Sequence, residues 1–493
     1  MNRFSHALTG LLLSAGVLIS SCEQELLHPV PPSTLTTVNA FNDAKSINLA
    51  VLGAYSSLQS RVQSDYLIME LPSDNMWLDY AITAGSNQIN TLTVTPQNEV
   101  INNYWKANYS GIFRANNILK NIDKPTDYAD GEKEQYTGEA EFLRAKFYFD
   151  LVRIFGGVPE VTQIVTAEES RQIPRASEAD IYKLIVADLT DAVAKLPDPS
   201  AMAWGRASKG AALALLAKVY VYLEDWTNAK KNMDAFMALP DYGLVSNYAD
   251  LFKVATEENR EAIFSLPFVA GTNGQRLTYA LAPLGGVYDT INNGSRVGRP
   301  SWDLRSAFEK GDTRHAITMR DVFMPYNHKP GEDPIWWPYF SKWVVPSDPN
   351  NSGLDIPVLR FADMLLLDAE IKYNSNNLPG ALKQLNKVRE RAFGNILHDY
   401  TLADIATKET FYDKLLLERR LELACENQRW FDLVRTGRFV KVLQNIKGNY
   451  GSADGAGQVT VPVHAEAYMK YFPIPQEQID LAAEGVLAQN PNY

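Results

Sequence analysis

Apolar side chains recur at three- and four-residue spacing through both ends of this chain, a period that favours α-helices over strands. It predicts helices over Ala40–Gln59, about Asn98–Ile122, and Glu139–Phe155. A fourth helix is predicted over Glu178–Leu196, because Ser177 immediately before it is a favourable N-cap residue. The sequence therefore predicts a mainly α protein.

Two pairs of predicted helices resemble each other. Lys209–Glu224 is followed by Trp226–Leu239, and Phe361–Tyr373 is followed by Pro379–Ala392, with only a few turn residues within each pair. Both pairs are similar to the tetratricopeptide pattern, in which small residues let two antiparallel helices approach closely. More than a hundred residues separate the pairs. The pattern thus predicts an interrupted helical scaffold with a large insertion.

The insertion, about residues 242–357, is richer in Gly, Pro, Asn and aromatic residues than the helical parts. Glu261–Phe268 and Trp343–Val345 are predicted strands. Gly271–Pro300 and Met324–Pro338 are predicted long loops, and loops of that length in a compact domain are usually functional. The expected fold is mainly α, with tetratricopeptide-like helix pairs as the scaffold and a loop-rich insertion that contains short strands.

The first residues follow the pattern of a bacterial export signal. Arg3 precedes the apolar run Ala7–Ile19, which at about 1.5 Å rise per residue is too short to cross a hydrocarbon core of roughly 30 Å with comfort. Cys22 follows Leu18-Ile19-Ser20-Ser21, a sequence that resembles the lipobox of bacterial lipoproteins, in which the thiol receives a diacylglycerol. An ordinary secretory peptide with an unrelated cysteine is the alternative.

This pattern sets the expected organisation of the chain. Residues 1–21 are the expected signal peptide, Cys22 the lipid attachment site, and residues 22–39 a tether. Residues 40–493 are expected to form one domain, with the helical scaffold over about 40–241 and 358–445, and a C-terminal segment over 446–493. The acidic residues just after Cys22 also resemble a signal for export to the cell surface.

Composition argues against several functions. The formal charge is −11 and no Lys/Arg cluster is present, which disfavours nucleic-acid binding. With Cys22 acylated, Cys425 is the only thiol left, so neither an intramolecular disulfide nor a Cys-rich zinc site is expected. We expect Cys425 to be a small buried hydrophobe in an apolar helical stretch.

No enzyme motif is found in the chain. The six histidines show no metal-ligand spacing, and no glycine-rich phosphate loop is present. We therefore expect no catalytic residue and no cofactor, while the sequence leaves open whether Ca²⁺ binds.

Several longer motifs carry a family likeness. Gly138–Pro159, Arg360–Glu370 and Glu418–Arg438 resemble, in this order, the three core motifs of the SusD/RagB family of outer-membrane nutrient-binding lipoproteins. Tyr471–Pro475 and Gln489–Tyr493 are similar to the C-terminal signature of that family. The resemblance implies a SusD-like fold, lipid anchoring in the outer membrane, and oligosaccharide delivery to a SusC-like TonB-dependent transporter.

Two alternatives keep a similar fold but change the ligand. The RagB branch of the family handles peptides, and a tetratricopeptide-type scaffold that binds only proteins is the third possibility. The charged residues between Glu418 and Arg435 recur at three- and four-residue spacing on a predicted helical segment. We interpret them as architectural residues of a helix surface, with Arg stems packed against aromatic rings, and not as catalytic groups.

Aromatic side chains in loops are the candidate ligand contacts, because a flat ring stacks on the apolar face of a sugar while polar neighbours bind its hydroxyls. For each of them, ordinary core packing is the alternative. The candidates are Trp77 and Tyr80 in an N-terminal loop, and Tyr279, Tyr288, Trp336 and Trp337 in the insertion, with Asn292, Asn293, Arg296 and Arg299 as polar partners.

Overall fold

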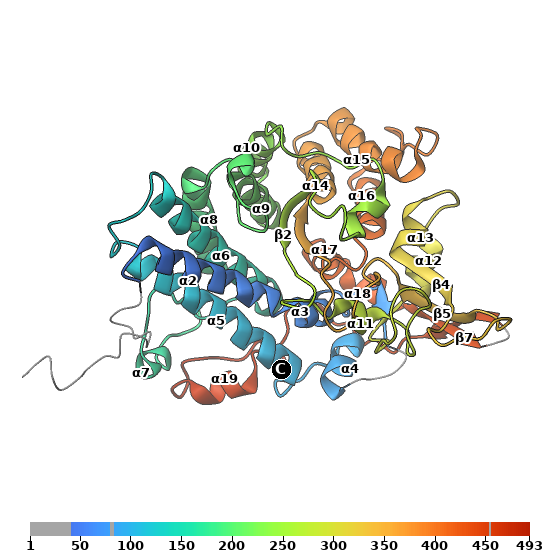
Figure 1. The fold of residues 1–493 in the computed structure, drawn as a ribbon, viewed down its shortest axis with the longest axis horizontal. Helices are drawn as coiled ribbons and strands as arrows, with labels where there is room; N and C mark the ends of the chain where they lie inside the picture. Colours follow the sequence, from blue (N-terminus) through green and yellow to red (C-terminus); the bar gives the residue numbers. More distant parts are fainter. Residues whose placement is uncertain (1–40, 79–82, 453–454) are drawn as a thin grey trace, which may run out of the picture.

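A computed structural model describes residues 41–78, 83–452 and 455–493 of the chain. Helices dominate it (Figure 1). The first half contains α2 (Ala44–Gln59), α3 (Val62–Met69), β1 (Met76–Trp77), α4 (Ala84–Thr91), α5 (Glu99–Asn121), α6 (Glu132–Phe155), α7 (Ala167–Ser170), α8 (Glu178–Lys195), η1 (Pro199–Ala201), α9 (Lys209–Tyr222) and α10 (Trp226–Met237).

The second half begins with the insertion and returns to helices. The insertion contains η2 (Tyr248–Phe252), β2 (Ala262–Leu266), α11 (Leu277–Leu281), β3 (Arg299–Pro300), α12 (Trp302–Ala307), α13 (Arg314–Thr318), β4 (Met319–Phe323), β5 (Ile335–Phe340) and β6 (Ile356–Arg360). The remainder contains α14 (Phe361–Asn374), α15 (Leu378–Phe393), α16 (Lys408–Glu422), α17 (Arg429–Arg435), α18 (Phe439–Leu443), β7 (Lys447–Ser452), β8 (Gly455–Thr460), η3 (Ala467–Lys470) and α19 (Gln476–Leu481).

The local sequence explains where the long helices begin. Asp43 caps α2 in a reciprocal box with Ser46, and the Asn98 side chain accepts hydrogen bonds from the first turn of α5. Ser177 caps α8 as predicted. Gly156 ends α6 with φ of 73°, a left-handed conformation that glycine adopts at little cost.

The predicted helix pairs are confirmed. Helices α9 and α10 pack against each other, as do α14 and α15, and α10 also packs on α14, which joins the two pairs (Figure 1). The main core runs from α2 to the C-terminal segment, and a smaller core lies between α14, α15 and α16. Helices α2, α5, α6 and α8 form one side of the molecule, strands β4 and β5 of the insertion lie on the opposite side with β7, and β2 lies between the two sides (Figure 1).

The insertion differs from its prediction in two places. Residues 343–345 form no strand: Trp343 lies in a turn closed by the hydrogen bond from the Val344 N–H to the Ser341 carbonyl, and Val344 and Val345 continue as irregular structure. The buried Trp343 indole donates to the Cys425 carbonyl at 2.9 Å. Residues 335–338 belong to strand β5 instead of a loop, because β5 pairs antiparallel with β4. The long loop Gly271–Pro300 also contains α11 and β3. The strand predicted at Glu261–Phe268 is confirmed as β2.

The helical segment predicted around Glu418–Arg435 is two helices, α16 and α17. Between them, Cys425 and Asn427 adopt φ of 61° and 62°, a left-handed conformation that breaks the helix. Cys425 is buried as expected, but it lies in this turn and not in a helix. Within the described residues, no helix is long and apolar enough to span a membrane.

Candidate functional site

Short strands bring several of the candidate aromatic residues together on one side of the insertion. Strand β1 pairs with β3, which places Trp77 opposite Arg299, and β5 pairs with β4, which places Trp336 opposite Val322. Strand β3 also lies against β5 and β7. We call the group of Trp302, Trp336 and Trp337 with Arg296, Arg299 and Arg305 the tryptophan platform.

Arg299 connects two of the predicted tryptophans. Its guanidinium carbon lies 4.0 Å from the centroid of the Trp337 ring and 5.5 Å from that of Trp77. The guanidinium carbon of Arg296 also lies 5.4 Å from the Trp337 centroid. Such cation–π contacts are worth about 0.5 to 2 kcal/mol each. They hold the half-buried Trp337 ring in one orientation.

Trp77 lies beneath this contact. It is in strand β1 and not in a loop as expected, and only 7% of it is exposed. The backbone of β7 crosses it so closely that a side-chain carbon on Gly448 would come within 2.6 Å of the indole. Trp77 therefore packs between Arg299 and the backbone of β7, and it does not present an open ring face to a ligand.

A second unit of the platform is built around Arg305. Its guanidinium lies 5.2 Å from the Trp336 centroid and 5.3 Å from that of Trp302. Asp321 accepts two hydrogen bonds from it, at 2.8 and 2.7 Å, and raises the pKa of Arg305. Trp302 was not among the predicted residues, because its link to Trp336 through Arg305 depends on long-range packing that no local motif encodes.

The other candidates lie in α11 and in the adjoining loops. Tyr279 is half-buried near Arg276, and Asn292 and Asn293 are exposed. Tyr288 is 48% exposed and packs edge-on against His328 at 4.2 Å between centroids. Its neighbours Val287 and Ile291 belong to a small core against which Trp337 packs, so this loop flanks the platform. Cys22 and Tyr80 lie outside the described residues.

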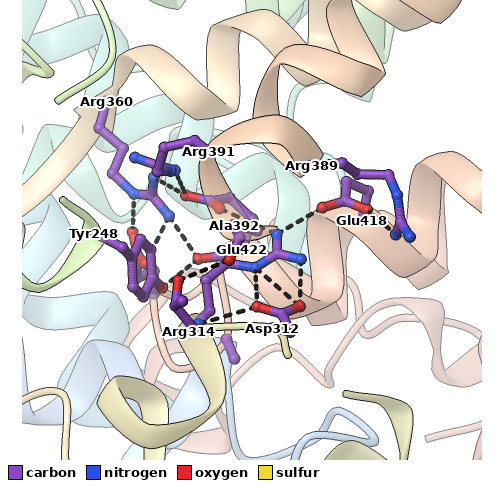
Figure 2. A network of polar contacts seen from close by, with 12 residues as sticks. Tyr248, Asp312, Arg314, Arg360, Arg389, Arg391, Ala392, Glu418 and Glu422 are labelled. Carbon is purple, nitrogen blue, oxygen red and sulfur yellow. Dashed lines mark hydrogen bonds and ion pairs between the residues drawn. The ribbon is translucent and has the colours of Figure 1, made fainter. Parts of the chain in front are cut away.

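Most charged residues of the third motif are buried and not on a helix surface. Arg314 bonds Glu418 at 2.6 Å and Glu422 at 3.2 Å, and Glu418 also accepts from Arg389 at 3.0 Å (Figure 2). The Arg314, Glu418 and Glu422 side chains are fully buried. The three- and four-residue spacing of the charges in the third motif fits an exposed helix surface equally well. The spacing alone does not reveal burial, because the ion-pair partners of these residues come from segments far apart in the sequence. The architectural interpretation holds, with a buried ion network as its form.

Two arginines of the third motif, Arg420 and Arg429, hold the segment just before strand β1. The Arg429 Nε and Nη2 atoms donate to the two carboxylate oxygens of Asp74 at 2.7 and 2.9 Å. Arg420 donates to the Asp74 carbonyl at 2.7 Å and to the Asn75 side-chain oxygen at 2.9 Å. The Ser301 N–H donates to the Asn75 carbonyl at 2.8 Å. The segment that leads into Trp77 is therefore fixed to α16, to α17 and to the residue that follows β3.

The stability of the protein at low pH should report on the ion pairs that Asp74 forms with Arg420 and Arg429. Burial alone would raise the pKa of Asp74, but Arg420 and Arg429 outweigh it and lower that pKa to about 2. A carboxylate whose pKa is lower in the folded than in the unfolded chain stabilises the fold above the unfolded pKa, and the gain is lost as the pH falls towards 2. Between pH 6 and pH 3 we expect wild type to lose about 1 kcal/mol more unfolding free energy than Asp74→Asn. Equal losses in urea titrations would contradict the assigned ion pair.

The described residues contain no group of three or more His, Cys, Asp or Glu side chains placed to hold a metal ion. The platform instead offers partly exposed aromatic rings held by arginines. This chemistry suits stacking and hydrogen bonding with an uncharged polar ligand.

Comparison with known proteins places the chain in a family context. Residues 316–493 match a family described as the SusD family, and residues 28–221 match one described as starch-binding and associating with the outer membrane. A SusD-like protein of Formosa agariphila is 25% identical over 518 residues, covering 94% of this chain and 94% of the relative.

Solved structures share the fold. A SusD-like carbohydrate-binding protein from Bacteroides fragilis is 25% identical, with a TM-score of 0.77 over 90% of this chain and 99% of that one. Surface glycan-binding protein A of Bacteroides thetaiotaomicron, solved in complex with laminarihexaose, is 22% identical, with a TM-score of 0.74 over 91% of this chain and 99% of that one. At 22% identity, the similarity to surface glycan-binding protein A shows a shared fold only.

Proposed function

The chain belongs to the SusD/RagB family, and from this premise we propose that it is a non-enzymatic glycan-binding lipoprotein of the outer membrane that faces the cell exterior. In this proposal it captures an oligosaccharide or polysaccharide and delivers it to a SusC-like TonB-dependent transporter. The expected lipid anchor at Cys22 keeps it at the membrane while the folded body binds the ligand.

The tryptophan platform is the observation that carries the proposal. Trp336 and Trp337 remain partly exposed, and arginines fix both rings before any ligand arrives. Rings that are held in place lose little conformational entropy on binding, so stacking on a sugar is less costly. The exposed Asn292 and the half-buried Arg296 in the neighbouring loop supply groups that hydrogen-bond sugar hydroxyls. Peptide uptake and protein binding are the rival functions for the same fold.

Replacing either of the two platform tryptophans in strand β5 tests the proposal. Trp336→Ala and Trp337→Ala should each weaken oligosaccharide binding by about 0.5 to 1.5 kcal/mol beyond the loss of contact area, which is roughly two- to tenfold in Kd. Isothermal titration of the lipid-free protein with a panel of oligosaccharides gives the measurement.

Phe113→Ala is the matched control, because Phe113 is 53% exposed on α5, outside the platform. It should leave the affinity unchanged. Sugar binding that is indifferent to both tryptophans would remove the platform from the site.

A further inference from the structure

A cavity lies where α9, α10, α14, α16 and α17 meet. Its volume is about 420 Å³, within the roughly 300 to 1,000 Å³ typical of small-ligand sites. None of its lining residues belongs to the tryptophan platform. We call it the helix-junction cavity.

Three aromatic rings line this cavity: Tyr222 at the end of α9, Trp226 at the start of α10, and Tyr412 in α16. Tyr222 is fixed by an edge-on contact with Phe149 at 5.1 Å between centroids. The Tyr412 hydroxyl accepts a hydrogen bond from the Asn374 side chain at 3.1 Å. Trp226 is half-buried. The aromatic lining is thus largely preorganised and partly open.

The polar lining is balanced in charge. Glu224, Glu370 and Glu409 provide three carboxylates, while Lys408, Arg435 and Arg438 provide three cations. Inside the cavity, Arg435 donates two hydrogen bonds to Glu370, at 2.6 and 2.8 Å, so these two charges already compensate each other. Arg438 in turn pairs with Asp413, outside the lining, so neither sign of charge is in large excess and the cavity favours neither an anion nor a cation. It suits a neutral ligand with several hydroxyl groups.

The backbone at Glu224 points to a role for its side chain. Glu224 adopts φ of 52° in the turn between α9 and α10, and Asn376 adopts 60° in the corresponding turn between α14 and α15. Asn tolerates this left-handed conformation because its short side chain can hydrogen-bond to the nearby backbone, whereas Glu adopts it at a steric cost without that compensation. A strained residue of this kind often marks a functional position. Here the strained glutamate is the one that lines the cavity.

From the aromatic lining, the balanced charge and the strained Glu224, we propose that the helix-junction cavity binds one or two sugar residues of a neutral glycan, as a saccharide site separate from the platform. This inference rests on the proposed glycan-binding function. A polysaccharide long enough to reach both sites gains avidity from the second contact, whereas a short oligosaccharide occupies each site independently.

Binding by variants of the two sites tests the proposal. The probes are neutral hexasaccharides, laminarihexaose and maltohexaose among them, titrated into lipid-free protein. The double variant Trp336→Ala/Trp337→Ala should retain weak binding that the further change Trp226→Ala removes. Trp226→Ala alone should lower the number of hexasaccharides bound per chain. Glu409→Gln, at an exposed position, should weaken the residual binding several-fold without lowering Tm.

Each other outcome has a definite meaning. If Trp226→Ala and Glu409→Gln bind like wild type, and the platform double variant binds nothing, the cavity is not a saccharide site although the proposed function stands. Binding of short neutral peptides that Trp226→Ala removes would overturn the saccharide assignment. If wild type binds no glycan of the panel, the proposed function itself fails.

Discussion

Arg360→Ala should lower the free energy of unfolding by about 3 to 5 kcal/mol, because it removes a cation that contacts three buried carboxylates and leaves each of them with less compensation. Arg360 donates to Glu426 at 2.6 and 2.9 Å, to Glu422 at 2.5 Å and to Glu261 at 3.0 Å. All four side chains are at most 4% exposed. Urea unfolding measured by circular dichroism gives the value.

Two further variants make this test specific. Arg360→Lys keeps the charge but cannot reach three carboxylates at once, so its loss should be intermediate. Lys230→Ala removes a pair with Asp234 in which both side chains are 52% exposed, and it should cost at most about 1 kcal/mol. A loss below about 1 kcal/mol for Arg360→Ala would show that the network adds little to stability.

Cys22→Ala should abolish membrane attachment while the body stays folded. Each buried methylene of an acyl chain contributes about 0.8 kcal/mol, and two or more chains give stable anchoring, so losing the thiol removes the anchor completely. The described body begins at residue 41, downstream of the expected tether. The full chain is expressed in a bacterial host without a transporter partner. The measurement is how the protein partitions between the detergent and aqueous phases.

Cys425→Ala is the matched control for this experiment. Cys425 is the other cysteine of the chain and is buried in the turn between α16 and α17, so its replacement should leave partitioning unchanged. If Cys22→Ala still enters the detergent phase, the lipid-anchor proposal is wrong.

The sequence predicted the helical framework well because local periodicity and caps determine it. The pairs α9–α10 and α14–α15 begin and end within about two residues of their predicted bounds. The prediction of a strand at Trp343–Val345 was wrong because a tertiary contact determines the local structure there. The Trp343 indole binds the Cys425 carbonyl, and no period-two pattern in three residues can reveal that contact.

The candidate site was predictable only in part. Aromatic content made Trp336 and Trp337 candidates, and they remain predictions. The link from Trp302 to Trp336 through Arg305 and the covering of Trp77 by β7 depend on contacts between distant segments. The burial of the third motif was missed for a similar reason. Charge spacing along one helix does not show that Arg360 reaches Glu422, 62 residues away.

Isothermal titration of the wild-type, lipid-free protein with parallel panels of oligosaccharides and short peptides tests the central proposal most directly. We predict saturable binding of at least one oligosaccharide that weakens when Trp336 or Trp337 is replaced, and no comparable peptide binding. Saturable binding to peptides alone would contradict the glycan assignment and favour peptide uptake by the same fold.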